Sequence, residues 1–286
     1  MASERGNSTR ALAGVLILSL VLVGLGYAGW RFFSRSLNIS IPPSEQCMAV
    51  VDGAAYSLTL EQVGNAAIIT GETLRRGLPA RAASVALATA MQESSLRNLD
   101  GGDRDSVGLF QQRPSQGWGT AADLQDPWYA TGKFLDALVK VDGWQTGDIN
   151  DTAQKVQKSG VPDGYRKHED SAKAWASALT GHSPAALTCV DRGTSLGATA
   201  PVTTLVKKVF GTRVTIAASG TTITLGSSDP TRLWAAVHLG IATTGDAGIT
   251  GATVGDQTWT HDGKKITTWS QTPAPQPTQA TITVRG

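Results

Sequence analysis

Three short runs between positions 92 and 111 carry side chains suited to acid–base chemistry. Gln92-Glu93-Ser94-Ser95 ends an alanine-rich apolar stretch, and Gly102-Asp103-Arg104 and Gly108-Leu109-Phe110-Gln111 follow it. A Glu at the end of such a helix enters a cleft partly desolvated, which raises its pKa and lets it donate a proton near neutral pH. The last run adds a glycine for close backbone approach, two apolar walls and an amide that donates and accepts. This combination is suited to cleaving a glycosidic bond in a polysaccharide.

These runs resemble a family signature. Glu93-Ser94 with Gly108-Leu109-Phe110-Gln111 is similar to the Glu-Ser and Gly-Leu-Met-Gln motifs of bacterial lytic transglycosylases of the SLT type and of goose-type lysozymes, with Phe110 in place of Met. Gly102-Asp103-Arg104 resembles the Gly-Asp-Arg of goose-type lysozymes, with a spacing one residue shorter. The resemblance is specific over residues 80–115 and general over 126–180. It implies a fold of the lysozyme-like superfamily, no cofactor, and cleavage of the β-1,4 bond between N-acetylmuramic acid and N-acetylglucosamine in peptidoglycan.

The resemblance also implies roles for individual residues. Glu93 is expected to be the general acid and base, and Asp103 is the candidate second carboxylate. An inverting lysozyme needs such a carboxylate about 6.5–9.5 Å from the acid, whereas a lytic transglycosylase needs none and forms a 1,6-anhydro ring. Gln112-Arg113-Pro114 stands where goose-type lysozymes have an Asp, which favours the anhydro product. The expected substrate-binding residues are Ser94, Ser106, Gln111 and Tyr165.

Each of these residues has a simpler alternative. For Glu93 the alternative is a solvated helix-end glutamate, the commonest position of this residue type, and the motif runs around it favour the catalytic role. Ser94 and Ser106 are equally caps of local turns, and so is Asp103. The alternative function is accordingly a catalytically silent lysozyme-like domain that binds glycan strands or scaffolds a cell-envelope or secretion complex, with its C-terminal domain contacting an envelope protein.

Charge, histidine and cysteine content exclude some classes of protein. The net charge is +2, but residues 1–36 hold four Arg and one Glu, so the remainder carries −1. The sequence has no basic stripe interleaved with aromatic residues, so nucleic-acid binding is not indicated. The four His are scattered, and no metal site is expected. Cys47 and Cys189 bracket the motif region and predict a disulfide formed outside the cytoplasm, unless they are two unrelated buried thiols.

The N-terminal region predicts a membrane anchor. Residues 11–30 contain no charge and, as a helix, are long enough to cross a bilayer. We expect a tail at 1–10, a transmembrane helix at 11–33 and extracytoplasmic domains beyond it; a cleaved signal peptide is the alternative. The expected location is therefore the cell membrane, with a single span.

The rest of the chain divides by composition. Residues 34–58 are expected to be a linker, because Pro42-Pro43 prevents a helix from continuing. Helical periodicity over 59–189 predicts a mainly α lysozyme-like domain that opens on a Thr59–Gln62 capping box. Residues 190–271 predict a small α+β domain, with hairpins at Ser219-Gly220 and Asp262-Gly263 and a helix after Asp229-Pro230. The proline-containing residues 272–286 are expected to be a flexible tail.

Overall fold

The computed structural model describes residues 44–270 and 277–286. Helices and strands of this part share one compact unit, residues 43–286. The helices are α2 (Leu60–Arg75), α3 (Ala80–Ser94), α4 (Ala121–Leu124), α5 (Pro127–Leu138), α6 (Ile149–Gln157), α7 (Glu169–Leu179), α8 (Ala200–Phe210), α9 (Pro230–Ile241) and α10 (Thr244–Ala247). The strands are β1 (Gln46–Val51), β2 (Ala54–Leu58), β3 (Leu187–Val190), β4 (Thr215–Ser219), β5 (Thr222–Gly226), β6 (Ile249–Val254), β7 (Gln257–Thr260) and β8 (Gln279–Val284).

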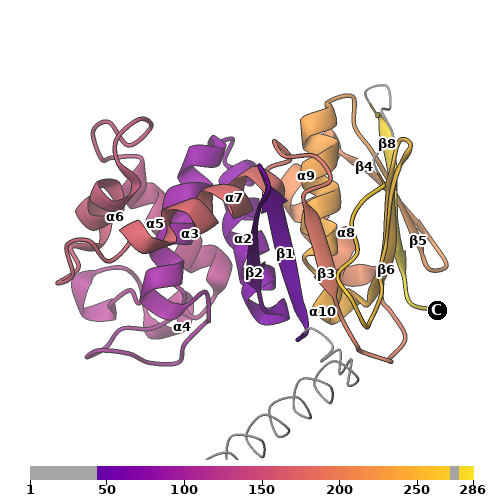
Figure 1. Cartoon of the computed structure of the whole chain (residues 1–286). Coiled ribbons are helices and arrows are strands. Elements are labelled where there is room, and N and C mark those ends of the chain that lie inside the picture. Colours follow the sequence, from indigo (N-terminus) through magenta and orange to yellow (C-terminus); the bar gives the residue numbers. More distant parts are fainter. Residues whose placement is uncertain (1–43, 271–276) are drawn as a thin grey trace, which may run out of the picture. The chain divides into compact units, whose positions relative to one another are not determined.

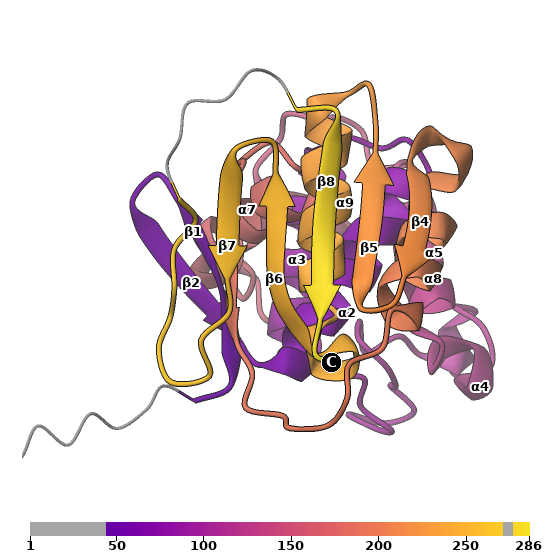
Figure 2. The same ribbon diagram turned by 90° about the vertical axis from the view of Figure 1, so that its right-hand side faces the viewer.

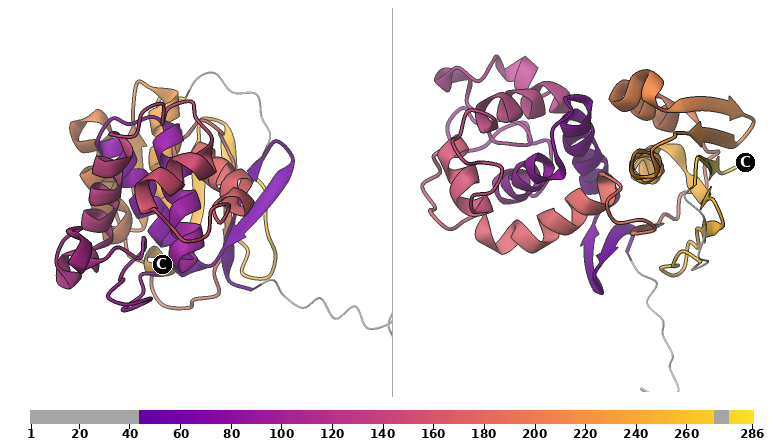
Figure 3. Two further views of the ribbon diagram at one scale, coloured as in Figure 1. Left: turned by 90° about the vertical axis from the view of Figure 1, so that its left-hand side faces the viewer. Right: turned by 90° about the horizontal axis from the view of Figure 1, so that it is seen from above.

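The helical region is built around α3. This helix is buried along most of its length, and its many alanines let α2, α6 and α7 pack closely against it (Figure 1, Figure 3). The predicted capping box starts α2: the Gln62 N–H donates to the Thr59 hydroxyl, and the Thr59 N–H donates to the Gln62 side chain. Asp126 caps α5, whose first residue is Pro127. Local sequence signals therefore set where these helices begin.

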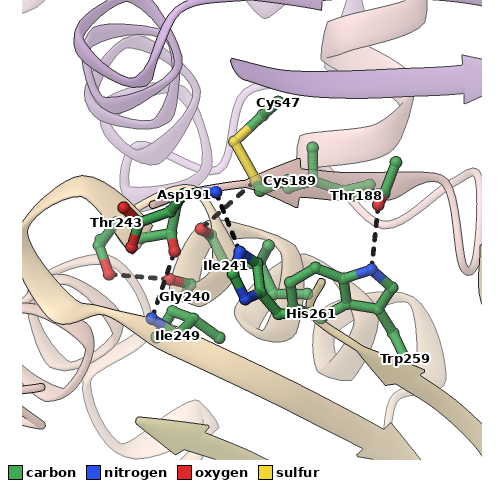
Figure 4. Close-up of a disulfide and its surroundings, with 12 residues drawn as sticks. Cys47, Thr188, Cys189, Asp191, Gly240, Ile241, Thr243, Ile249, Trp259 and His261 are labelled. Atoms are coloured by element: carbon green, nitrogen blue, oxygen red, sulfur yellow. Dashed lines mark hydrogen bonds between the residues drawn. A yellow bond between two sulfur atoms is a disulfide. The ribbon is translucent and has the colours of Figure 1, made fainter. Parts of the chain in front are cut away.

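A three-stranded antiparallel sheet, in the order β2-β1-β3, lies beside the helical region. Cys47 on β1 and Cys189 on β3 are register partners, and the predicted disulfide joins them (Figure 4). The bond therefore closes the two ends of the helical region on each other. Around it, the Asp191 N–H donates to Nε2 of His261, and the indole N–H of Trp259 donates to the Thr188 hydroxyl.

A five-stranded antiparallel sheet, in the order β4-β5-β8-β6-β7, forms the C-terminal part (Figure 2). Its inner face is apolar and packs against α9, as the alternation of β8 illustrates: Ala280, Ile282 and Val284 are buried, whereas Thr281 and Thr283 point to the other face. α8 packs against both α9 and α2, so the C-terminal elements continue the core of the helical region.

The predicted fold class, a mainly α lysozyme-like domain after one N-terminal transmembrane helix and followed by a small α+β domain, is wrong for the described residues. They combine helices with two antiparallel sheets, and residues 46–58, expected within a linker at 34–58, form β1 and β2. Asp52 and Gly53 join these strands with φ of 51° and 79°. A two-residue hairpin turn with both φ values positive is the usual connection for an Asp-Gly pair, which explains the strands.

The C-terminal predictions were correct in part. The hairpin at Ser219-Gly220 and the helix after Asp229-Pro230 are confirmed. The hairpin at Asp262-Gly263 is wrong: β7 forms its hairpin with the preceding strand β6, and residues 261–270 contain no strand. The flexible tail at 272–286 is also wrong over Gln279–Val284: this segment is β8, the middle strand of the sheet, because its alternating residues bury one face between β5 and β6.

The predicted membrane segment, residues 11–33, and the tail at 1–10 lie outside the described residues. Among residues 44–270 and 277–286, no helix has the length and apolar character needed to cross a membrane. The two predicted domains, 59–189 and 190–271, fall within the same compact unit.

Candidate active site

Glu93 lies in the last turn of α3, and side chains of α2 hydrogen-bond to the residues that follow it. Ser95 and Leu96 both adopt left-handed backbone angles, with φ of 54° and 57°, which end the helix. Nε2 of Gln62 donates to the Ser95 carbonyl and Nδ2 of Asn65 donates to the Leu96 carbonyl, each at 2.8 Å. Two polar side chains of a neighbouring helix therefore fix the turn directly after Glu93.

The carboxyl group of Glu93 is half-buried and has two neutral donors. The hydroxyl of Tyr165 donates to Glu93 Oε1 at 2.6 Å, and the side-chain amide of Gln157 also hydrogen-bonds to the carboxyl group. Burial raises the pKa of Glu93, and the two hydrogen bonds lower it by a smaller amount. The net result is a carboxylic acid that holds its proton more tightly than an exposed glutamate, as a proton donor requires.

Tyr165 is fully buried between α6 and α7. Its N–H donates to Oδ1 of Asn150, and Nδ2 of Asn150 donates in turn to the Pro162 carbonyl. Burial and the neighbouring Glu93 raise the pKa of Tyr165, so the phenol remains protonated and acts as a donor. Asn150 at the start of α6 therefore positions the segment that carries Tyr165.

The Gly-Leu-Phe-Gln loop is built as a rigid turn. Gly108 has φ of 77°, and a Cβ there would lie 2.4 Å from the Leu124 carbonyl oxygen, so only glycine fits. Leu109 and Phe110 are fully buried, and Phe110 stacks on Phe134 with ring centroids 4.7 Å apart. These two apolar side chains therefore belong to the core, not to the walls of a cleft as the sequence suggested.

Two side chains tie this loop to the helices beside it. The buried hydroxyl of Ser94 donates to the Leu109 carbonyl at 2.7 Å, and Nε2 of Gln157 donates to the Phe110 carbonyl at 2.7 Å. The Ser94 hydroxyl is thus engaged within the protein. Gln157 contacts both the loop and Glu93, and so couples the position of one to the other.

Gln111 follows in a left-handed conformation, with φ of 47°. Its Nε2 donates to the Gly108 carbonyl at 3.2 Å, and its Oε1 lies where a side chain on Gly102 would begin. The amide therefore folds back over the two glycines. Its predicted role in holding a sugar or Glu93 stays a prediction.

The candidate second carboxylates differ in their surroundings. Asp103 is 91% exposed, and its nearest ionic neighbour is Arg104 at 3.9 Å. Asp105 accepts hydrogen bonds from Nε of Arg113 at 2.8 Å and from the Ser115 N–H at 2.7 Å, and these donors lower its pKa. The Ser106 side chain is buried in the same turn, and the backbone N–H of Ser106 donates to the Asp103 carbonyl.

The structure thus brings Glu93, Tyr165 and the loop carrying Gln111 together, and it leaves Asp103 exposed to solvent. Sequence reasoning missed Gln157, a glutamine on an amphipathic helix that no motif distinguishes. Within the described residues, no group of three or more His, Cys, Asp or Glu side chains is arranged to hold a metal ion. Comparison of the chain with family models and with curated proteins finds no match.

Proposed function

We propose that this chain cleaves the β-1,4 bond between N-acetylmuramic acid and N-acetylglucosamine in peptidoglycan, with Glu93 as the catalytic acid. The observation that carries this proposal is the half-buried Glu93 carboxyl group, whose pKa is raised by burial and whose orientation is set by the Tyr165 hydroxyl at 2.6 Å. A perturbed carboxyl group beside a motif loop is a recurrent arrangement of general acids.

The reaction uses Glu93 twice. The acid first protonates the glycosidic oxygen as its bond to C1 breaks, and the resulting carboxylate is stabilised by Tyr165 and Gln157. The carboxylate then removes the proton from the C6 hydroxyl of the muramyl sugar, whose oxygen bonds to C1 and closes a 1,6-anhydro ring. Since Asp103 is exposed and Asp105 is held by Arg113, neither is set up as a second base, which favours this product over hydrolysis.

The disulfide supports a location outside the cytoplasm. Cys47 and Cys189 are both fully buried and bonded, and a structural disulfide persists in oxidising compartments. Peptidoglycan lies in such a compartment, so the proposed substrate and the redox state of the chain agree.

A catalytically silent, glycan-binding role is the second candidate. It is favoured by the exposed outer face of the five-stranded sheet, which carries Thr224 and Ser219 and has no assigned partner among the described residues. Incubation of the full-length chain with purified peptidoglycan separates the two. The enzyme releases soluble muropeptides, whereas the silent protein co-sediments with the wall and releases none.

A further inference from the structure

Four lysines surround one hollow in the helical region. The hollow has a volume of about 570 Å³ and lies between the end of α5, the segment after it and α6. Lys133 and Lys140 line it on the α5 side, and Lys155 and Lys158 line it from α6. α6 lies on the side of the helical region away from the five-stranded sheet (Figure 1). The chain has ten lysines, so this is a local concentration of positive charge.

These lysines are not neutralised by the protein. None of the four forms an ion pair with a carboxylate of the described residues. Asp136 also lines the hollow, but Arg76 holds it at 2.6 Å. Lys133 lies over the Tyr129 ring. Its charge helps to lower the pKa of Asp123, but the two side chains form no ion pair. The hollow therefore presents uncompensated positive charge to whatever enters it.

The floor of the hollow is apolar. Trp118, Val141 and Val156 line it, together with Val139, which is 44% exposed. An apolar floor under a ring of ammonium groups suits a flexible chain that alternates carbon segments with negative charges. A concave surface of this kind fits a chain better than it fits a bilayer, into which apolar side chains must protrude.

The hollow is connected to the candidate site through α6. Lys155, Val156 and Lys158 flank Gln157 in sequence, and Gln157 contacts both Glu93 and the Phe110 carbonyl. The hollow and the candidate site therefore share helix α6, although Glu93, Tyr165 and Gln157 do not line the hollow.

We propose that this hollow binds a phosphodiester-linked polyol chain of the cell wall. The proposal rests on the proposed function, because that function places the chain in contact with wall polymers. Lysine binds phosphate as a point charge, and a phosphodiester chain carries one charge on every unit. A stem peptide on a glycan offers fewer and more widely spaced carboxylates, so four lysines around one hollow match the phosphodiester chain better.

The test measures binding of a short poly(glycerol phosphate) to the full-length chain by calorimetry at low salt. This probe has no glycosidic bond, so its binding is independent of cleavage by Glu93. The triple variant Lys140→Gln, Lys155→Gln, Lys158→Gln should bind about 100-fold more weakly, because each lysine near a dense negative charge contributes about a factor of five. Replacing the same three lysines by Arg should preserve binding. A matched control removes the same charge elsewhere, with Lys207, Lys264 and Lys265 changed to Gln.

Binding lost in the triple Gln variant and kept in the Arg variant and the control supports the proposal. No binding by the wild-type chain, or equal loss in the control, overturns it. Parallel titrations with polygalacturonate and with anionic lipid micelles identify other occupants. If binding of polygalacturonate or of the micelles depends on the three lysines and binding of poly(glycerol phosphate) does not, the phosphodiester assignment is wrong. Wall cleavage measured on the same preparations reports the proposed function separately.

Discussion

Replacing Tyr165 by Phe removes the donor that contacts Glu93 and little else. The phenol is fully buried, and its hydroxyl lies 2.6 Å from Glu93 Oε1. The Phe ring occupies the same space, so the change creates no large cavity. What is lost is one hydrogen bond to a carboxyl group whose charge depends on pH.

The size of the effect follows from that geometry. An O–H···O bond of 2.6 Å lies in the short range of bonds to a charged acceptor, and such bonds contribute about 1.5–3 kcal/mol to the free energy of unfolding. A bond between neutral partners contributes about 0.5–1.5 kcal/mol. Tyr165→Phe should therefore cost about 1.5–3 kcal/mol at a pH where Glu93 is ionised, and roughly half as much where Glu93 is protonated.

Urea unfolding of both chains, followed by tryptophan fluorescence at high and low pH, measures this difference. Tyr129→Phe serves as the control, because its half-buried ring lies under Lys133 and makes no contact with Glu93. The same substitution should raise the pKa of Glu93, since a stabiliser of the carboxylate is gone, and move the high-pH limb of wall cleavage upwards. A cost that is the same at both pH values, or a limb that moves to lower pH, would refute the assigned contact.

Three further outcomes follow from the described residues. Changing Cys47 and Cys189 to Ser should lower the free energy of unfolding by about 5 kcal/mol in the chain-entropy model, since 142 residues separate them; a denaturant titration showing a loss below about 1 kcal/mol would contradict this. Gly108→Ala should lower the melting temperature more than Gly117→Ala, because a Cβ at Gly117 meets open space whereas one at Gly108 meets a carbonyl oxygen; equal melting temperatures would argue against the clash. Asp103→Asn should leave the rate and the anhydro product unchanged, and mass analysis that finds only reducing ends, lost in this variant, would make the protein a lysozyme instead.

Local signals in the sequence were sufficient for much of the helical region. Thr59 and Asp126 begin helices where capping rules place them, and Gly108 stands at the turn that the motif predicts. Glu93 and Tyr165 were both singled out, and they are in contact. These features depend on residues close in sequence or on a motif, so they need no knowledge of the tertiary packing.

Contacts between distant segments were not predictable in the same way. Gln157 meets Glu93 only because α6 packs against α3, and nothing in its own neighbourhood marks it. β8 pairs with β5 and β6, which lie far from it in sequence, so its alternating residues gave no sign of a central position. Asp52-Gly53 was a hairpin signal within the sequence, and the prolines before it directed the interpretation towards a linker.

The raised pKa of Glu93 also predicts how the stability of the Glu93→Gln variant compares with that of the wild-type chain. A carboxyl group whose pKa is higher in the folded chain than in the unfolded chain binds its proton more tightly when folded, so the protein loses stability as pH rises from the ordinary value of 4.5 through the folded value. Glu93→Gln removes this ionisation. The variant should therefore be at least as stable as the wild-type chain at neutral pH, and any loss of activity is not explained by unfolding.

The rate at which the Glu93→Gln chain releases muropeptides from purified peptidoglycan tests the central claim most directly. Glu61→Gln, an exposed glutamate on α2, is the matched control. We predict a rate at least about 10²–10⁴-fold lower for Glu93→Gln, the usual contribution of a general acid, and a wild-type rate for Glu61→Gln. Release by Glu93→Gln at the wild-type rate would contradict the assignment of Glu93 as the catalytic acid.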